Sequence, residues 1–454
     1  MRYHSVLTSP DFATLNEGQK ITALAAMQGK NILISGGGGV GKSHLIRFIV
    51  QHLTDLILTA STGIAAINIM GQTLDSLMGF NQSVKTPLDA RKMDDATVER
   101  LALVTAILID EVSMVRADKL DMLDQRLQAA KGNSLPFGGV QIILVGDFCQ
   151  LPPVVSNKAA DKQYQRLYQK RLFAFESDVY PRAGFTPYVL NEYVRQGHEE
   201  TRRVLRNLRM GNKIQDGVDF INSAARGRVN ENSLRICKTN DRVAEINRDA
   251  FAKLDSEAFT THAVKKGFFP FSSMPVDMKI PLKQHCRLLL TVNKPEDGYL
   301  NGDLGTLMGF HKHYLVVKLD RGGVVYVEPH TWENFEYDVD SESVSLSKKA
   351  VGTFTQYPVR LGYAITGHKS QGMTLDSAVV DFSGRFNADG LAYVVLSRVR
   401  SLDNLKLTAP LRVSDIRTSE KARTFTYQIS MEALNRRDED RARFLSGTQW
   451  ADAA

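Results

Sequence analysis

Near its amino end the chain reads Gly36-Gly37-Gly38-Gly39-Val40-Gly41-Lys42-Ser43. An apolar segment typical of a strand, 31–35, precedes this run, and an apolar segment with helical periodicity, 44–53, follows it. The pattern G-x-x-x-x-G-K-[ST] at a strand-to-helix turn directs backbone N–H groups and a helix N-terminus toward one point, which suits a triphosphate. A glycine-rich turn that binds nothing is the alternative, but the lysine and serine that follow argue against it. The sequence therefore predicts that the chain binds a nucleoside triphosphate.

Both side chains and backbone of the predicted loop would contact the nucleotide and its metal ion. Lys42 would reach the β- and γ-phosphates, and the Ser43 hydroxyl would hold Mg²⁺. The backbone that would surround the phosphates comes from Gly36, Gly37, Gly38, Gly39, Val40 and Gly41.

Composition limits the class of protein. A chain of 454 residues is long enough for two to four domains with ample core. The net charge of +7 favours an anionic partner, although such an excess also occurs on ordinary solvated surfaces. The three cysteines have neither metal-ligand nor disulfide spacing, no apolar run is long enough to span a bilayer, and 1–10 lacks a signal-peptide core. We expect a soluble intracellular protein that makes no use of a membrane.

The order of apolar segments predicts an α/β fold. Short apolar strands alternate with amphipathic helices over residues 31–190, as in a parallel sheet. The predicted strands are 31–35, 56–59, 107–109, 141–145 and 188–190. A second set of strands and helices begins near Leu234 and resumes near Val359. Between them, 287–292, 315–320 and 324–328 have β character, with Gly322-Gly323 as a hairpin turn, so we expect a small β-barrel inserted in the second lobe.

A second motif is Ile107-Leu108-Ile109-Asp110-Glu111, an apolar strand that ends in two carboxylates. Asp110 would hold Mg²⁺ through water, and Glu111 would polarise the attacking water. Acidic pairs at strand ends are usually inert, but the phosphate loop upstream favours the functional interpretation. A GTPase would need an N-K-x-D motif downstream, and the sequence has none. ATP is therefore the predicted nucleotide.

Three further polar residues are candidates for sensing or stabilising the γ-phosphate. Gln150 follows the strand 141–145 in Gly146-Asp147-Phe148-Cys149-Gln150 and would sense the γ-phosphate. Arg195 and Arg398 are suited to act as arginine fingers from the second lobe, although a single arginine is more often a surface ion-pair partner.

Several longer segments resemble those of the PIF (petite integration frequency) family of superfamily 1 5′-to-3′ DNA helicases. The resemblance spans roughly residues 14–405. It is carried by Asp118-Lys119-Leu120-Asp121, Pro136-Phe137-Gly138-Gly139-Val140-Gln141, 146–154, Phe173-Ala174-Phe175-Glu176-Ser177, Leu300-Asn301-Gly302-Asp303 and 357–376. RecD-type and Dda-type helicases share the core motifs but lack the Pro-Phe-Gly-Gly segment.

The resemblance implies two RecA-like lobes. The first would be 1–185 with a short wedge insert at about 76–98. The second would be 186–282 with 356–430, interrupted by an SH3-like β-barrel at 283–355. A charged, helical tail that frays at its polar end would occupy 431–454.

The resemblance also implies further site residues. Gln19 would contact adenine, and Gln371 and Gly372 would join the ATP site. The single-stranded DNA backbone would be held by short polar residues that allow close approach to phosphates, with Phe80 as a candidate wedge. These DNA-contact candidates are Thr59, Ser61, Thr62, Gly63, Thr73, Phe80, Thr366, His368 and Ser370. Where the family usually has Thr-x-His-Ser, this chain has Thr73-Leu74-Asp75-Ser76. An acidic side chain beside DNA is unfavourable, so this departure argues against a DNA contact by Asp75. A core position is an equally good interpretation of Phe80.

The function implied is an ATP- and Mg²⁺-dependent DNA helicase that moves 5′ to 3′ on single-stranded DNA and opens forks in replication, recombination or repair. We expect a monomer in the cytoplasm of a bacterial or virus-infected cell, with a nuclear location left open and proteins of those pathways as partners. Two alternatives remain at this point. One is a related motor: a RecD-type or Dda-type helicase, or an ATP-driven nucleic-acid translocase or RNA-directed motor without strong unwinding. The other is an ATP-gated DNA-binding switch with negligible turnover.

Overall fold

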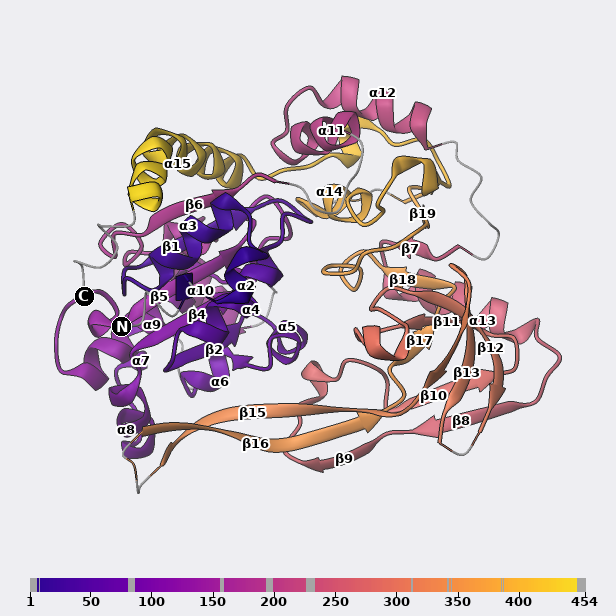
Figure 1. Cartoon of the computed structure of the whole chain (residues 1–454), viewed down its shortest axis with the longest axis horizontal. Coiled ribbons are helices and arrows are strands. Elements are labelled where there is room, and N and C mark those ends of the chain that lie inside the picture. Colours follow the sequence, from indigo (N-terminus) through magenta and orange to yellow (C-terminus); the bar gives the residue numbers. More distant parts are fainter. Residues whose placement is uncertain are drawn as a thin grey trace. The chain divides into compact units, whose positions relative to one another are not determined.

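A computed structural model of the chain (Figure 1) describes most of its residues. The described ranges are 6–7, 9–80, 86–155, 159–192, 199–225, 233–311, 313–340, 343, 345–384, 386 and 388–446. The chain forms two compact units: Met1–Val194 with Asn334–Ala350 and Glu420–Ala454, and Arg195–Glu333 with Val351–Ser419. Among the described residues, no helix combines the length and apolar character needed to cross a membrane.

A six-stranded parallel sheet forms the centre of the first unit, with the order β3-β2-β4-β5-β1-β6. Its strands are β1 (Ile32–Gly36), β2 (Leu56–Ala60), β3 (Gln72–Thr73), β4 (Ala106–Asp110), β5 (Gln141–Gly146) and β6 (Thr186–Leu190). Every predicted strand of this lobe is present. Because the strands are parallel, their carboxyl ends meet at one edge of the sheet, and that edge carries the predicted ATP motifs.

Alternate residues of these strands enter two separate apolar cores. Ile107 and Ile109 of β4 belong to one core, whereas Leu108 between them belongs to the other. This alternation explains why the strands are apolar on both faces, as is typical of parallel sheets covered by helices. The apolar faces of α4 and α9 supply residues to the second and the first of these cores, respectively.

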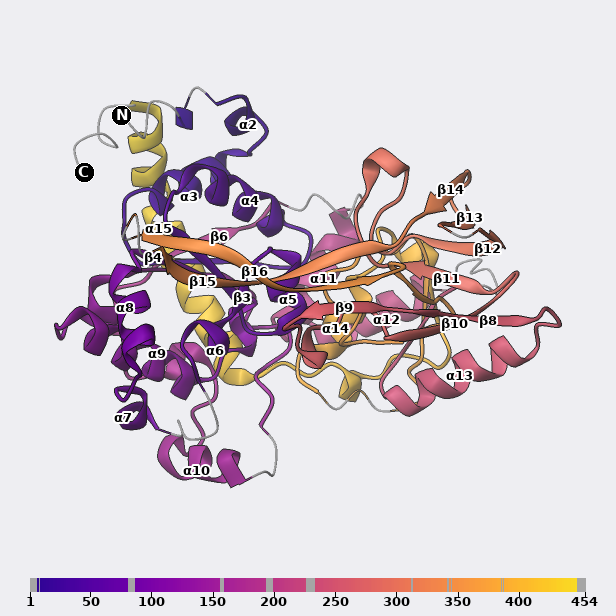
Figure 2. The ribbon, with the colours of Figure 1, turned by 90° about the horizontal axis from the view of Figure 1, so that it is seen from below.

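The helices of the first unit lie around this sheet (Figure 1). They are α2 (Pro10–Ala13), α3 (Glu17–Ala26), α4 (Lys42–His52), α5 (Gly63–Asn68), α6 (Leu74–Leu77), α7 (Pro87–Ala90), α8 (Asp95–Leu103), α9 (Ala117–Lys131), α10 (Ala159–Tyr168) and α15 (Glu420–Ser446). Figure 2 shows α7 and α8 beside α9. The predicted wedge insert, 76–98, therefore contains α7 and the start of α8.

The Pro-Phe-Gly-Gly segment has a structural explanation. It forms a short turn, Pro136–Gly139, in which Phe137 is fully buried and Phe137 and Gly138 have positive φ angles of 53° and 62°. The buried carboxylate of Asp124 on α9 accepts a 2.6 Å hydrogen bond from the Phe137 backbone N–H. A Cβ atom on Gly138 would lie 2.6 Å from the Leu127 carbonyl oxygen. This turn fastens the start of β5 to α9.

The second unit contains a smaller parallel sheet with the order β18-β7-β19-β20. Its strands are β7 (Arg235–Cys237), β18 (Ala364–Thr366), β19 (Ala378–Val380) and β20 (Leu405–Leu407). The helices of this unit are α11 (Glu199–Arg209), α12 (Ile214–Ala224), α13 (Asn240–Ala252) and α14 (Leu391–Leu396). The prediction of a second α/β lobe is confirmed.

Antiparallel sheets make up the rest of the second unit. The largest has the order β14-β13-β12-β11-β17, a second pairs β10 with β8, and a third has the order β15-β16-β9. The strands are β8 (Ala258–His262), β9 (Val264–Gly267), β10 (Lys279–Lys283), β11 (Arg287–Leu290), β12 (Leu304–Phe310), β13 (Leu315–Leu319), β14 (Val324–Val327), β15 (His330–Asp340), β16 (Ser345–Gln356) and β17 (Val359–Leu361). The hairpin at Gly322-Gly323 is confirmed, because Lys318 pairs with Val324 across it.

In the second unit, a glycine allows the segments 300–303 and 357–376 to lie in close contact. In Leu300-Asn301-Gly302-Asp303, Gly302 has a φ angle of 103°, and a Cβ atom there would lie 2.4 Å from the carbonyl oxygen of Thr374. Only a glycine allows the two backbones to approach this closely. The segment 300–303 is thus packed against 357–376.

The predicted domain boundaries differ from those of the structure in three places. β6 pairs with β1, so it belongs to the first unit and not to the second. The β-rich region begins at Ala258, not at residue 283, since β8, β9 and β10 precede the predicted start. Glu420–Ser446 is one continuous helix of the first unit and not the end of a lobe followed by a tail. Sequence periodicity missed these points because strand pairing and helix docking are tertiary properties.

The hairpin of β15 and β16 belongs to both units, with its base in the second and 334–350 in the first. Tyr337 near its tip is buried in the core of the first unit, and its hydroxyl accepts a 3.1 Å hydrogen bond from the backbone N–H of Leu58. This segment is therefore part of the first unit's core, not of a separate β insert.

We expect Gly138→Ala to destabilise the first unit by about 3 kcal/mol or more, because it combines a positive φ angle with a clash against fixed backbone. Gly132→Ala is the matched control: its φ angle of 64° is similar, but no atom lies within 4 Å of the added Cβ. That substitution should cost only about 1 kcal/mol. Urea unfolding of both variants measures the difference. Equal losses would contradict the packing described for the turn.

Candidate functional site

The predicted phosphate loop joins β1 to α4. Gly39 and Gly41 have φ angles of 84° and 82°, which a side chain would disfavour. A Cβ atom on Gly36 would lie 2.8 Å from the Leu190 carbonyl oxygen, so β6 closely covers the start of the loop. The Lys42 ammonium donates hydrogen bonds to the carbonyl oxygens of Gly36 at 2.7 Å and Gly37 at 2.9 Å. The lysine is therefore held within the loop, at the N-terminus of α4.

Gln19 is tied to this loop from α3. Its backbone N–H donates to the Asn16 side chain at 2.8 Å, while its side-chain oxygen accepts from the Asn16 N–H at 3.0 Å. Its amide nitrogen donates to the Gly41 carbonyl oxygen at 3.2 Å, and the side chain is buried. Each polar atom of the Gln19 side chain thus makes one hydrogen bond with the protein. The second N–H of the amide and the second lone pair of the oxygen could still serve a contact with adenine.

Asp110 is the last residue of β4, and Glu111 follows it at the same edge of the sheet. Burial raises the pKa of the Asp110 carboxyl, while a hydrogen bond from the Glu111 N–H, 2.8 Å long, and the positive charge of Lys42 act in the opposite direction. Glu111 has φ 52° and ψ 45°, a left-handed conformation that is uncommon for residues other than glycine. Strained backbone of this kind is frequent at functional sites, because it fixes the direction of a side chain. A carboxylate near the loop lysine suits a magnesium ion bound with the nucleotide.

Gln150 follows β5 in a loop organised by the buried Asp147. One carboxylate oxygen of Asp147 accepts from the Cys149 N–H at 3.1 Å, and the other accepts from the Gln150 side chain at 3.2 Å. Gly146 permits the approach of this loop to the residue after Glu111, because a Cβ there would lie 3.0 Å from the backbone nitrogen of Val112. The loop is therefore fixed against the end of β4. Sequence reasoning interpreted Gly-Asp only as a turn and missed the role of Asp147.

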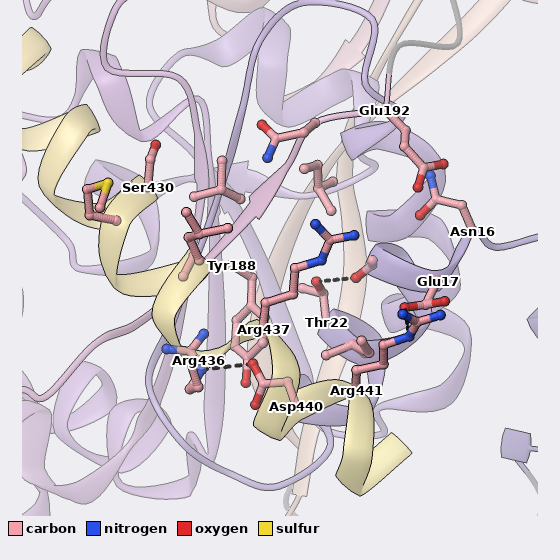
Figure 3. A pocket seen from close by; sticks show the side chains of 18 of the residues that line it. Asn16, Glu17, Thr22, Tyr188, Glu192, Ser430, Arg436, Arg437, Asp440 and Arg441 are labelled. Carbon is pink, nitrogen blue, oxygen red and sulfur yellow. Dashed lines mark hydrogen bonds and ion pairs between the residues drawn. The ribbon is translucent and has the colours of Figure 1, made fainter. Parts of the chain in front are cut away.

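A cavity of about 510 Å³ lies between the start of α3, the end of β6 and α15. In Figure 3, Arg437 of α15 extends into it toward Thr22 of α3. Ion pairs at its rim join Arg441 to Glu17 at 3.1 Å and Arg436 to Asp440 at 2.8 Å. Its wall includes Leu190, the residue that covers the first glycine of the phosphate loop. The helix α15 thus supplies one wall of a cavity beside that loop.

The predicted DNA contacts of the first unit divide into two groups. Thr59 is fully buried within β2, and its hydroxyl donates to the Leu108 carbonyl oxygen at 2.8 Å, so its DNA contact stays a prediction that the side chain does not favour. Thr62 and Thr73 instead cap α5 and α6. Both lie at the carboxyl ends of strands β2 and β3, and the hydroxyl of each accepts a backbone N–H. Their roles, with those of Ser61 and Gly63 beside them, stay predictions.

The structure favours a core position for Phe80 over the role of a wedge. It is partly buried and packs against the core of the first unit. The Lys119 ammonium lies 4.7 Å and the Arg126 guanidinium 5.1 Å from the centre of its ring. The unusual Asp75 forms a 3.0 Å ion pair with the same lysine, which reduces its negative field. Residues 81–85 of the predicted wedge lie outside the described residues.

In the second unit, the residues predicted to hold DNA are mostly enclosed. Ser370 is fully buried and donates to the Gly367 carbonyl oxygen at 2.7 Å, so its DNA contact stays a prediction that the side chain does not favour. Thr366 is 5% exposed, and its hydroxyl accepts from the Lys369 N–H. His368 is exposed, and Gln371 and Gly372 follow it in the same turn. Of the three DNA candidates in this unit, only His368 presents its side chain freely.

Arg398 does not have the setting that the sequence predicted. The expected amphipathic helix is α14, which ends at Leu396 and is buried on every face. The Arg398 guanidinium is 2% exposed and donates to the Val394 carbonyl oxygen at 2.7 Å and the Ser397 hydroxyl at 2.8 Å. Acting as a finger would require these bonds to break. The other predicted finger, Arg195, lies outside the described residues.

Comparison with known proteins identifies relatives across most of the chain. A family model described as PIF1-like helicase matches residues 15–180. The ATP-dependent DNA helicase Pif1 of Psychrobacter sp. (strain PRwf-1) is 29% identical over a match that covers 86% of this chain and 67% of that protein. This chain spans 46% to 89% of the lengths of the first three curated relatives.

Two solved structures extend this comparison. The crystal structure of Bacteroides sp Pif1 in complex with ADP-AlF4 is similar with a TM-score of 0.83 and 32% identity, covering 92% of this chain and 97% of that one. Bacteroides Pif1 bound to ssDNA has the same identity and coverage with a TM-score of 0.64.

We expect Asp110→Asn to stabilise the nucleotide-free protein and to abolish turnover. Because burial raises the folded-state pKa of this carboxyl, its contribution to stability falls as the pH rises from the ordinary Asp value through the raised one. A neutral amide removes that cost, which should add about 1 kcal/mol at pH 7. Loss of the metal contact should lower turnover at least about a hundredfold.

Thermal unfolding at pH 7, with and without Mg²⁺ and a nonhydrolysable ATP analogue, measures the stability of each protein and the stability gained from the bound nucleotide. ATPase assays measure the turnover. The wild type should gain more stability from the analogue than the variant does. A variant that is less stable than the wild type without nucleotide would contradict this account of Asp110.

Proposed function

The chain belongs to the PIF1-like helicase family of ATP-dependent DNA helicases, and we propose that it hydrolyses ATP to move 5′ to 3′ along single-stranded DNA and to separate the duplex ahead of it. The observation that carries the proposal is the shared carboxyl edge of β1, β4 and β5. It brings together Lys42, Asp110 and the Asp147–Gln150 loop, with the Lys42 charge acting on the Asp110 carboxyl.

The reaction proposed at this edge is attack of water on the γ-phosphate of ATP. Lys42 and the N–H groups of the loop would bind the phosphates. Glu111 would orient the water and accept its proton, and its fixed backbone conformation supports that task. Ser43 and Asp110 would hold Mg²⁺, which when bound neutralises charge on the phosphate oxygens. Gln150 would report the presence of the γ-phosphate.

Residues of the second unit would complete the site. Arg398 and Arg195 would stabilise charge on the transferring phosphoryl group, and Gln371 and Gly372 would approach the nucleotide. Gln19 would contact adenine with the polar groups of its side-chain amide. ADP-AlF4 in the Bacteroides relative supports a nucleotide site in this fold.

Single-stranded DNA and forked duplexes are the proposed nucleic-acid partners. Bacteroides Pif1 has been solved bound to ssDNA, and another similar structure concerns DNA unwinding at forked dsDNA by two Pif1 helicases. On this chain, Ser61, Thr62, Gly63, Thr73 and His368 are the DNA contacts that we retain. The five-stranded antiparallel sheet within 283–361 would form an SH3-like module that guides DNA. The +7 charge of the chain is compatible with an anionic partner.

The first test is the effect of DNA on hydrolysis. We expect ATPase activity to be low alone and at least about tenfold higher with single-stranded DNA, because a motor of the proposed kind couples hydrolysis to the strand along which it moves. Lys42→Ala should abolish hydrolysis while leaving DNA binding largely intact, since no DNA contact is proposed for it. Lys30→Ala, a change outside the loop, is the control. Equal turnover with and without DNA would point to a constitutive ATPase.

The second test is the direction of movement. Forks with a 5′ or a 3′ single-stranded tail should be opened only when the 5′ tail is present, in an ATP-dependent strand-separation assay. Local residue patterns do not encode direction, so this expectation depends on family membership. Preferential opening of 3′-tailed forks would overturn the polarity. Translocation on single strands without strand separation would favour a motor that does not unwind.

A further inference from the structure

We propose that the first two turns of α15 are a positioning element for Gln150 and act on it through Phe148 and Cys149. This inference depends on the role proposed for Gln150 above. It assigns a part in ATP hydrolysis to residues about 275 positions away in the sequence, Ala422, Phe425 and Thr426, that lie in no recognised motif.

The contact with Cys149 is direct and buried. The Thr426 hydroxyl lies 3.4 Å from the Cys149 sulfur, and the Ala422 carbonyl oxygen lies 3.9 Å from it. Cys149 and Thr426 are each only 1% exposed, and Ala422 is fully buried. The backbone N–H of the same cysteine donates to Asp147, whose other carboxylate oxygen accepts from Gln150. One chain of contacts therefore leads from Thr426 to the Gln150 amide.

A cluster of aromatic rings holds the neighbouring residue. The Phe425 ring meets the edge of Phe148 with centroids 5.3 Å apart at 89°, and stacks on Phe175 at 4.0 Å and 6°. Phe148 also meets Phe175 edge-on at 5.0 Å. Phe148 is 1% exposed, so a shift of Phe425 must be taken up by the residues around it. Phe148 and Cys149, two consecutive residues of the Gln150 loop, are thus both in contact with α15.

The first turn of the helix is itself anchored. Lys421 forms an ion pair with Glu176 and donates a 2.8 Å hydrogen bond to the Lys170 carbonyl oxygen. Glu176 in turn accepts from the backbone N–H groups of Leu172 and Phe173. These directional bonds connect the first turn of α15 to the segment 170–176. They oppose a sliding of the helix along its axis, which apolar packing opposes less. The geometry suits a support that limits where the Gln150 amide can point.

The contacts have a specific consequence for catalysis. Gln150 is 7% exposed, and its amide is directed by Asp147 rather than by solvent. Relaxing Cys149 would let this loop sample other positions, which slows a step that needs the amide in place without weakening the phosphate loop. A loss of turnover at nearly constant KM for ATP is therefore the signature of a positioning role.

The test compares Thr426→Val with Thr424→Val in DNA-saturated ATPase assays. Thr424 lies on the same helix but is exposed, so its substitution controls for the effect of valine on the helix. Thr426→Val should lower kcat by about fivefold to tenfold, less than the roughly hundredfold loss that a 1 Å misplacement can cause, with KM for ATP changed less than about twofold. Thr426→Ser, which restores the hydroxyl, should recover most of kcat.

A double-mutant cycle with Gln150→Ala separates the two claims. If Gln150→Ala leaves kcat unchanged, the proposed role of Gln150 is wrong. If Gln150→Ala lowers kcat, Thr426→Val should have little further effect in that background, since both act on one group. Additive losses, or a Thr426→Val protein with normal melting temperature and normal kcat, would overturn the inference. Phe425→Leu gives a second, independent disturbance of the same loop, with the same expectation.

Discussion

The parallel pairing of β1 with β5 and of β5 with β4 is the constraint on which the rest of the first unit depends. Each strand is buried on both faces, so its register is specified by two apolar layers at once. A shift of one residue would move Leu108 and Ile109 into each other's core. The same register fixes the carboxyl ends of the three strands side by side. The residues proposed to bind ATP are thus brought to one edge of the sheet by the packing of these strands.

Backbone geometry at the strand ends continues this arrangement. Gly36, Gly41 and Gly146 each occupy a place where a side chain would clash or would disfavour the backbone, and Glu111 adopts a left-handed conformation that stores strain. The loops that follow β1, β4 and β5 can therefore approach one another more closely than ordinary side chains allow. Burial then raises the pKa of Asp110, whose charged form is favoured again when a cation is bound. The buried Asp110 carboxyl therefore lowers the stability of the folded protein as long as no cation is bound beside it.

Distant segments complete the first unit. Residues 334–350 insert Tyr337 into its core, and α15 packs Phe425 and Thr426 against the loop of Gln150. Both segments follow long excursions of the chain through the second unit. Packing that closes such long loops costs chain entropy, which the buried aromatic groups must offset. The core of the first unit is thus completed by two segments that are far from its strands in the sequence.

The sequence by itself determined the parallel sheet, the phosphate loop, the Asp110-Glu111 pair and the family. These follow from local spacing, since a strand, a glycine-rich turn and a helix are encoded by neighbouring residues. Only the tertiary structure decided that Thr59 and Ser370 are buried, that Arg398 is held by the backbone near its own helix, and that α15 belongs to the first unit. Exposure and long-range contact depend on which surfaces meet after folding. Periodicity marks the face of a helix or strand that will be covered, but not the segment that covers it.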